Sequence, residues 1–231
     1  MSWMEFHHDN AEALCQACAT RLADAMIDDL RQGRKPTMAL AGGRTAPPIF
    51  RQLCTQDLPW AQLTVVPTDE RWVPYAHPDC NLRQLRESFL APGLHSVSLV
   101  PENPQGEVDA GFARRQLTHF AGEFSAVMLG MGADGHFASL FPGAATLSAA
   151  LDPAAVEDAY ALIPEPMPSA GPHPRISLSL SRLLRTRVLM LVITGADKAR
   201  TLRLAQETPA SSPVGALLHA PDAHVEIHWC P

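Results

Sequence analysis

The chain has 231 residues, 46% of them apolar, and it carries 18 basic against 24 acidic side chains, a formal net charge of −6. This length is enough to bury a core, and the composition is that of a folded globular protein. The negative charge argues against nucleic acid as a partner, and it means that any anionic ligand must be held by a few local cations.

The first half of the chain predicts helices that alternate with strands. Residues 10–30 carry apolar side chains at helical spacing, with Asp9 or Asn10 placed to cap the helix start. Short apolar runs predict strands at residues 37–43, 63–69 and 96–100, and helical patterns follow them at residues 47–54, 81–90 and 108–120.

The second half continues the alternation. Further strands are expected at residues 125–132, 160–163, 176–180, 188–194 and 225–229, with helices at residues 197–206 and 214–219. The proline-rich residues 164–174 are interpreted as a surface loop. The principal strands are continuously apolar rather than two-sided, which is typical of a mainly parallel sheet covered by helices on both faces. We therefore predict an α/β fold, a single-domain three-layer α/β/α sandwich with a Rossmann-like sheet over residues 1–231.

The N-terminus and the cysteines indicate a cytoplasmic protein without membrane contact. Acids and histidines stand where a secretory signal needs a basic start and an apolar stretch. The longest apolar run, residues 188–193, is far shorter than the roughly 20 residues of a membrane span. Five cysteines form no paired framework. Cys15 and Cys18 make one CxxC inside a predicted helix, where packing explains them better than a metal does.

Three predicted strands end in residues that can bind or react. Ligands gather beyond the carboxyl ends of parallel strands, so these ends are considered together. The first carries Gly42, Gly43, Arg44 and Thr45, where consecutive glycines and a helix start can turn backbone N–H groups toward an anion. Taken alone, this turn is equally well a tight connection.

The second strand end carries Asp69, Glu70 and Arg71, followed by a loop that contains Pro74 and Pro78. Taken alone, this cluster is interpreted as a group of solvated charges at the end of a strand.

The third strand end is the segment LGMGADGHFASLFPG, residues 129–143. Its glycines, Gly130, Gly132 and Gly135, allow positive φ and close approach of the backbone to a ligand. We expect His136 to begin a short helix, whose dipole would lower the imidazole pKa and favour the neutral base. Asp134 is placed to orient that ring or to hold substrate hydroxyls. A lone histidine is more often structural, but three such strand ends favour a site.

These segments together resemble the 6-phosphogluconolactonases, and the resemblance covers nearly the whole chain. The matching motifs are GG-x-T at residues 42–45, DER-x-VP-x-x-H at 69–77 with Asn81 after it, LG-x-G-x-DGH-x-ASLFPG at 129–143, RISLS at 175–179 and G-x-x-KA at 195–199. Ala46, Arg44 and Cys80 depart from the usual proline, serine and serine. The third motif is long and specific, and the others follow in the family's order.

The resemblance implies hydrolysis of 6-phosphoglucono-δ-lactone to 6-phosphogluconate in the oxidative pentose phosphate pathway, without a metal or an organic cofactor. His136 would be the general base, and Asp134 and Asp69 would organise neighbouring groups. The residues implied to bind the substrate or its phosphate are Gly42, Gly43, Arg44, Thr45, Arg71, Gly132, Arg175 and Lys198. The N–H groups of glycines beside the reacting centre would stabilise the developing oxyanion. The partner is thus a small sugar-phosphate lactone, and the chain would be a monomer or a small homo-oligomer.

Simpler interpretations remain for two of these cations and for the other histidines. Arg175 is also explained as an exposed charge at a strand edge, and Lys198 as a surface lysine at a helix start. Scattered surface positions are expected for the histidines at positions 7, 8, 119, 224 and 228.

Two alternative functions share the implied fold. Glucosamine-6-phosphate deaminase has a glutamate five residues after its histidine, where this chain has Phe141, and usually an aromatic residue where it has Arg71. A sugar-phosphate sensor would usually carry a helix-turn-helix segment before the first strand, for which residues 1–36 leave little room. Both comparisons favour the lactonase.

Overall fold

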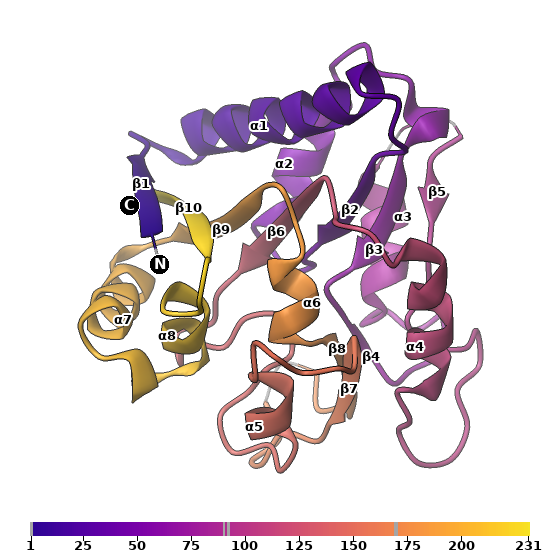
Figure 1. The fold of residues 1–231 in the computed structure, drawn as a ribbon, viewed down its shortest axis with the longest axis vertical. Coiled ribbons are helices and arrows are strands. Elements are labelled where there is room, and N and C mark those ends of the chain that lie inside the picture. Colours follow the sequence, from indigo (N-terminus) through magenta and orange to yellow (C-terminus); the bar gives the residue numbers. More distant parts are fainter. Residues whose placement is uncertain (1, 90, 92, 169–170) are drawn as a thin grey trace.

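A seven-stranded parallel sheet forms the centre of the computed structural model, which describes residues 2–89, 91, 93–168 and 171–231. Its strands run in parallel throughout, so the predicted parallel sheet is confirmed. From one edge to the other, the strands are β1 (Ser2–His7), β10 (His224–Cys230), β9 (Leu189–Thr194), β6 (Ala126–Gly130), β2 (Thr37–Leu40), β3 (Thr64–Pro67) and β5 (His95–Ser96) (Figure 1).

Helices cover both faces of this sheet because successive strand side chains enter two different cores. Met38 and Leu40 pack into one apolar cluster, and Ala39 between them packs into the other. The first cluster includes side chains of α1 (Ala11–Arg31), α2 (Ala46–Leu53) and α3 (Asn81–Ser88). The second includes those of α4 (Gly111–Leu117), α5 (Leu147–Ala150), α6 (Leu180–Leu184), α7 (Ala196–Glu207) and α8 (Pro213–Leu218). The three-layer α/β/α arrangement is therefore confirmed.

A second, smaller sheet lies beside the end of β3. It is antiparallel and consists of β4 (Asp69–Arg71), β8 (Arg175–Leu178) and β7 (Ala159–Leu162). The strand predicted over residues 63–69 ends at Pro67, and at Thr68 the backbone bonds both Leu40 of the large sheet and Leu178 of the small one. The chain thus changes sheets at Thr68, which carries the polar residues after it out of the main sheet.

Several local predictions differ from the structure. The strand β1 was not predicted, although it pairs along its whole length with β10 at the sheet edge. The short helices α5 and α6 were also missed, and the strand expected at residues 96–100 is reduced to His95 and Ser96. His228 is buried, stacked on Phe6 and bonded to His8, so the surface expected for the extra histidines is wrong there. The predicted cap is found at Asn10, whose Oδ1 accepts the N–H of Ala13 at 2.9 Å.

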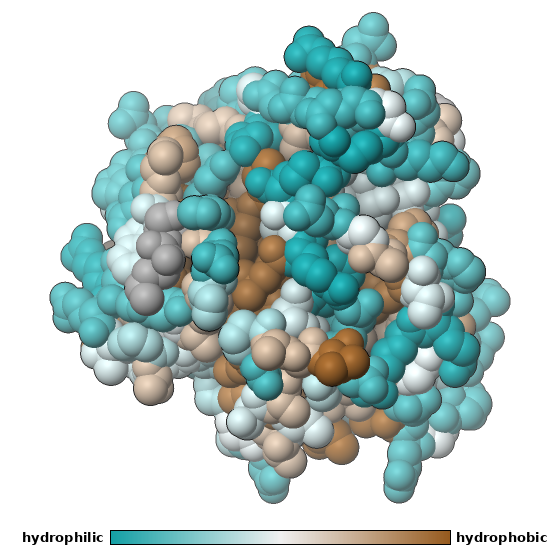
Figure 2. All heavy atoms as spheres, in the orientation of Figure 1, coloured by the Kyte–Doolittle hydropathy of each residue, from teal (hydrophilic) through white to brown (hydrophobic). Residues whose placement is uncertain are grey.

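The outer surface is largely polar on the face seen in Figure 2, where apolar side chains show mainly in the furrows between elements. The large apolar side chains that are exposed lie at scattered positions: Met4, Val156, Ile163, Met167 and Leu204. Among the described residues, every helix is too short or too polar to cross a bilayer.

Glu70 is the buried charge that fixes the connection between β4 and α3. Its side chain is fully buried, and its Oε1 accepts the backbone N–H groups of Arg71 at 2.8 Å and Asn81 at 2.7 Å. Its Oε2 accepts the N–H of Leu82 at 2.8 Å. Asn81 and Leu82 begin α3, so the carboxylate satisfies amides that the first turn of a helix leaves unbonded.

We expect Glu70→Gln to lower the free energy of unfolding by about 1–3 kcal/mol, because a carboxamide sets its own NH₂ group against one of three buried N–H donors. Urea unfolding followed by circular dichroism measures this change. Glu87→Gln is the matched control: Glu87 lies on α3, the helix whose first turn Glu70 caps, and its exposed pair with Arg83 is worth about 1 kcal/mol or less. Equal midpoints for the two variants would contradict the role of Glu70.

Candidate functional site

The three strand ends marked by the sequence meet at one edge of the large sheet. The chain leaves β2 for β3 on one side, whereas β6 and β9 lie on the other side of β2. Such a change of direction opens a crevice beyond the carboxyl ends of the strands, where α/β folds bind their ligands. Loops that follow β2, β3, β6 and β9 therefore surround this crevice and carry the predicted residues.

The glycine loop after β2 packs tightly against the segment that follows β4. A side chain at Gly42 would place its Cβ 2.5 Å from Oδ1 of Asn81, and Asn81 in turn donates to the backbone oxygen of Asp69 at 2.8 Å. Gly43 has a φ of +85°, which favours glycine. Arg44 is exposed, and among the described contacts Thr45 does not use its side chain to cap α2. The loop thus presents its polar groups to the crevice side of α2.

Two arginines face each other across the small sheet. Arg71 of β4 and Arg175 of β8 are direct partners in the antiparallel register, and Arg175 is only 2% exposed. Arg71 donates Nη1 to the backbone oxygen of Asp79 and Arg175 donates Nη2 to that of Gly171, each at 2.6 Å. The Nε of each arginine is buried and has no bond to any described residue. The interpretation of Arg175 as an exposed edge charge is therefore wrong.

This opposition of like charges is unfavourable in the absence of an anion. Burial and the charge of Arg71 lower the pKa of Arg175, and like charges directly opposite each other destabilise a strand pair. Guanidinium groups with unused N–H donors match the oxygens of phosphate or carboxylate. The arginine pair therefore has the properties of an anion-binding site.

Lys198 brings a further cation to the same edge. It stands in the first turn of α7, directly after β9, and it is half-buried rather than a freely solvated surface lysine. Burial lowers its pKa, and the charge of Arg44 lowers it further, which places the glycine loop and the start of α7 near each other. A dianion between Lys198 and Arg44 would relieve their mutual repulsion.

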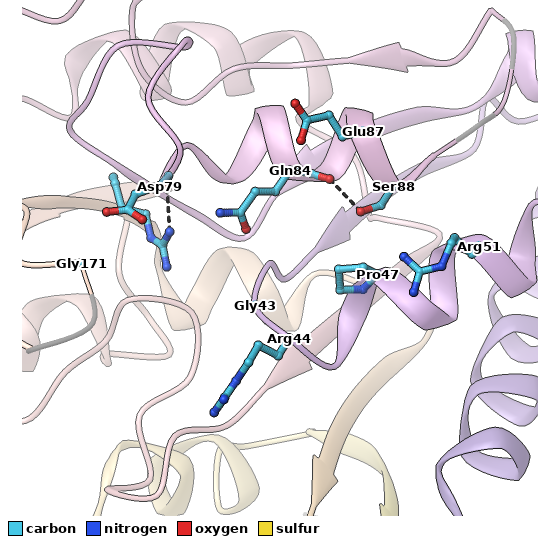
Figure 3. Close-up of a pocket in the computed structure, with 10 residues that line it drawn as sticks. Gly43, Arg44, Pro47, Arg51, Asp79, Gln84, Glu87, Ser88 and Gly171 are labelled. Atoms are coloured by element: carbon cyan, nitrogen blue, oxygen red, sulfur yellow. Dashed lines mark hydrogen bonds between the residues drawn. The ribbon is translucent and has the colours of Figure 1, made fainter.

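A cavity of ≈ 600 Å³ opens beside these cations (Figure 3). It is lined by Gly43 and Arg44 of the glycine loop, by Arg71, and by Asp79 and Gln84 before and within α3. Figure 3 shows Gln84 and Asp79 on the wall opposite Arg44. Arg175 and Lys198 are not part of this lining. Asp79 and Gln84 were not singled out from the sequence, although Asp79 lies between His77 and Asn81 of the second matching segment.

The loop that carries His136 is irregular, so the predicted helix is wrong. Residues 131–146, all of which the structure describes, form turns and extended segments. The helix-dipole argument for His136 therefore fails. The loop is fixed instead by the fully buried Phe137 and Leu140 and by an N–H bond from Gly132 to the backbone oxygen of His136 at 2.9 Å. Ala138 has a φ of +47°, a conformation that the buried neighbours must impose.

The glycines of this loop are needed for two different reasons. Gly135 has a φ of +79°, as the sequence predicts, whereas Gly130 and Gly132 lie outside the left-handed region. At Gly132 the constraint is space, because a Cβ there would lie 2.3 Å from the ring of His136 and 2.5 Å from Oδ1 of Asp134. Glycine at position 132 thus permits the approach of the histidine–aspartate pair to the backbone.

Asp134 replaces the helix as the group that orients His136. Its Oδ1 lies 2.6 Å from Nδ1 of the imidazole and 3.2 Å from the backbone nitrogen of the same residue. Burial raises the pKa of the Asp134 carboxyl, but the hydrogen bond and the charge of His136 outweigh it and hold that pKa below its usual range. Asp134 is therefore ionised at neutral pH and favours the imidazole with a proton on Nδ1, which leaves Nε2 free to act as a base.

Phe141 connects the histidine with the buried arginine. Its ring centroid lies 4.0 Å from that of His136, and the guanidinium carbon of Arg175 lies 5.7 Å from the Phe141 centroid. His136 and Arg175 are therefore separated by one aromatic ring. The ring of Phe141 also occupies the position at which the deaminase has the glutamate of its histidine–carboxylate relay.

Asp69 is bonded to two hydroxyl groups, one of them on a residue that the sequence analysis did not single out. Its carboxylate accepts hydroxyl bonds from Ser139 at 2.5 Å and Thr68 at 3.1 Å. Ser139 belongs to the His136 loop, so this bond ties that loop to β4. Because Ser139 stands inside the quoted motif, its hydroxyl could have been found from the sequence.

One group of side chains within the described residues has the ligands and spacing of a metal site, and it consists of His77, Asp79 and His173. The cysteine pair in α1 does not belong to such a group. Cys18 is fully buried, and burial raises the pKa of its thiol to about 12, which accords with packing.

Comparisons with known proteins agree with this geometry. Residues 9–229 match the family described as glucosamine-6-phosphate isomerases/6-phosphogluconolactonase. A 6-phosphogluconolactonase of Caulobacter vibrioides is 34% identical over 94% of this chain and 93% of its own, and one of Pseudomonas putida is 34% identical over 96% and 90%. The crystal structure of a 6-phosphogluconolactonase from Shewanella baltica superposes with a TM-score of 0.91 at 28% identity, covering 100% of this chain and 98% of that one.

We expect phosphate to raise the melting temperature of the wild-type chain more than that of Arg71→Met, because the variant lacks the opposed charge. A ligand that binds only the folded state stabilises it, and 1 kcal/mol corresponds to about 2–4 °C at this size. The readout is the difference between the two proteins, since phosphate also stabilises proteins in general. Arg115→Met, an exposed change on α4, is the control and should respond like wild type. Equal shifts in all three proteins would exclude the arginine pair as an anion site.

Proposed function

Because the chain belongs to the family of glucosamine-6-phosphate isomerases and 6-phosphogluconolactonases, we propose that it hydrolyses 6-phosphoglucono-δ-lactone to 6-phosphogluconate. The observation that carries this proposal is the placement of an oriented histidine and an opposed arginine pair around the switch point of one sheet. The reaction needs these two elements, a base beside the lactone carbonyl and cations for a phosphate.

His136 is proposed as the general base. Its Nε2 takes a proton from a water molecule as the water oxygen bonds to C1 of the lactone, which gives a tetrahedral oxyanion. When the C1–ring oxygen bond breaks, the imidazolium returns that proton to the ring oxygen, which becomes a hydroxyl. The acid product then loses its proton to solvent, so one water is consumed and one proton is released for each lactone opened. Asp134 holds the ring and stabilises its charged form.

The phosphate group is proposed to bind between the glycine loop and the cations. Arg71 and Arg175 offer unused N–H donors, and Lys198 and Arg44 add charge from the other side. Gly42, Gly43 and Thr45 shape the loop at the start of α2. A dianion at this place offsets the cation repulsion described above, and this explains how a chain of net charge −6 can bind an anionic substrate.

Phe141 separates this activity from the deaminase that shares the fold. The deaminase relay needs a carboxylate next to the histidine. Here the ring of Phe141 packs on His136 at 4.0 Å and cannot carry a proton. The lactone reaction needs no such relay, since a single base–acid pair completes it.

We further propose that residues 1–231 form one domain that acts in the cytoplasm as a monomer or a small homo-oligomer. Cys15, Cys18, Cys80 and Cys230 are free thiols, which supports a reducing compartment. No metal or organic cofactor is needed for the steps proposed above.

We expect His136→Ala to lower kcat by about 10² to 10⁴ while KM stays within a few-fold, because the base acts in the transition state. Acid release in a pH-stat measures this, with the lactone produced in place by glucose-6-phosphate dehydrogenase and the spontaneous rate subtracted. His119→Ala is the control, because His119 is an exposed residue in the short helix before β6, outside the His136 loop. A variant at position 136 with the wild-type kcat would show that another group is the base.

We expect Lys198→Met to lower kcat/KM for the phosphorylated lactone by about 10- to 100-fold, the cost of one charged hydrogen bond, and to leave the rate on glucono-δ-lactone nearly unchanged. Lys35→Met is a matched control, since Lys35 is the other lysine in the chain and is exposed near the start of β2. The test compares both substrates for all three proteins. Equal losses on both lactones would remove Lys198 from the phosphate site.

A further inference from the structure

Three side chains at the rim of the cavity converge without a role in the proposed reaction. His77 and Asp79 belong to the loop between β4 and α3, and His173 lies just before β8. One ligand atom of each lies within 4.8 Å of those of the other two. Asp79 also lines the cavity, so the group is reached from the same space as the cations.

The contacts among the three leave a compact set of nitrogen and oxygen atoms. Nε2 of His173 lies 2.9 Å from Oδ2 of Asp79, and the His77 and His173 rings meet edge to face with centroids 5.1 Å apart. Nδ1 of His77 accepts the backbone N–H of Asp79 at 3.1 Å, so this nitrogen carries no proton. His173 first, with Arg71 also contributing, lowers the pKa of Asp79, whose carboxyl is therefore ionised at neutral pH.

Two imidazole nitrogens and one carboxylate oxygen are the protein ligands of many zinc sites that keep a fourth position open. With bonds of 2.0–2.1 Å, tetrahedral ligand atoms lie about 3.3 Å apart. His173 and Asp79 are already closer than this, and the ligand atom of His77, which lies within 4.8 Å of the other two, moves closer when the metal binds. We propose that His77, Asp79 and His173 form a binding site for a zinc-class divalent cation at the rim of the cavity.

Zinc replaces the proton that His173 and Asp79 share. His173 binds the metal through the Nε2 lone pair, and the imidazole keeps its one proton on the other ring nitrogen, Nδ1. Metal and proton therefore compete, and zinc affinity falls as the pH is lowered through the range in which imidazoles protonate. The half-buried side chains, 23% exposed for His173 and 38% for Asp79, allow the metal to enter from solvent.

The site is distinct from the proposed base. His136 is held by Asp134 in another loop, and lactone hydrolysis as proposed uses no metal. Two cations lie beside the site: Arg71 donates to the backbone oxygen of Asp79, and Arg175 donates Nη2 to the backbone oxygen of Gly171, two residues before His173. These cations weaken a dication's binding as long as no anion lies between them.

Calorimetric titration of the chelator-treated, full-length chain with zinc chloride tests the site directly. We expect the wild type to bind one equivalent of zinc. His77→Ala, His173→Gln and Asp79→Asn should each lower the zinc affinity by at least about tenfold, since removing a group that only hydrogen-bonds to a metal ligand already costs that much. His173→Gln keeps a donor toward Asp79, which protects the fold, and circular dichroism checks each variant. His119→Ala is the control and should bind like wild type.

Cobalt provides a second readout that excludes the cysteines. Co²⁺ bound by imidazole and carboxylate absorbs in the visible without a thiolate-to-metal band in the near ultraviolet. Absence of zinc uptake by the wild type, unchanged affinity in the three variants, or a thiolate band would each overturn the proposal.

A further titration in the presence of 6-phosphogluconate rests on the proposed function, unlike the measurements above. An anion among the arginines removes the repulsion that opposes the dication, so zinc affinity should rise by a factor within the range of about 5 to 150. Unchanged or weaker zinc binding, in a chain that has bound one equivalent, would contradict the placement of the phosphate and leave the metal site intact.

Discussion

One buried carboxylate holds the site together. Glu70 accepts three backbone N–H groups and thereby joins β4 to the first turn of α3. The loop closed by these bonds contains Arg71 and Asp79, and Asn81 at its end leaves no room for a side chain at Gly42. The geometry of the glycine loop, of the arginine pair and of the cavity wall thus depends on a residue that is not itself one of the expected ligands. A carboxylate fully removed from water is costly, and here three backbone N–H groups and the thiol of Cys80 offset that cost.

The arginine pair represents the opposite situation, in which the folded chain alone leaves charges poorly compensated. Arg71 and Arg175 are register partners with unused Nε groups, and the chain positions them so although the sheet would be more stable with a neutral pair. The small sheet is needed for this arrangement. If the strand had continued in the large sheet past Thr68, Arg71 would have a parallel neighbour, and Arg175 would not lie opposite it. The change of sheet is therefore part of the anion site.

The sequence predicts the large sheet well because continuous apolar runs are a local signal. The core strands β2, β3, β6 and β9 were all recognised from such runs. It also marks the strand ends, since Gly42, Arg71 and His136 depart sharply from a core pattern. It fails where the determinant is a partner distant in the chain. Strand β1 is stabilised by pairing with β10, whose register partners lie 222 residues further along the chain. The opposition of Arg71 and Arg175 likewise follows from a register that no local pattern contains.

The His136 loop differs from the sequence-based expectation in how the histidine is held at the edge of the sheet. The helix start predicted from glycines and an aspartate is absent, and the ring is oriented instead by Asp134, by the small volume of Gly132 and by the face of Phe141. This arrangement suits a substrate whose reacting carbon and phosphate group are close together. In the lactone, C1 is joined to the phosphorylated C6 through the ring oxygen and C5, so the base and the phosphate cations must stand near each other without forming a contact. A single aromatic ring between His136 and Arg175 satisfies both conditions, and an acidic residue at position 141 would instead draw the arginine toward the histidine.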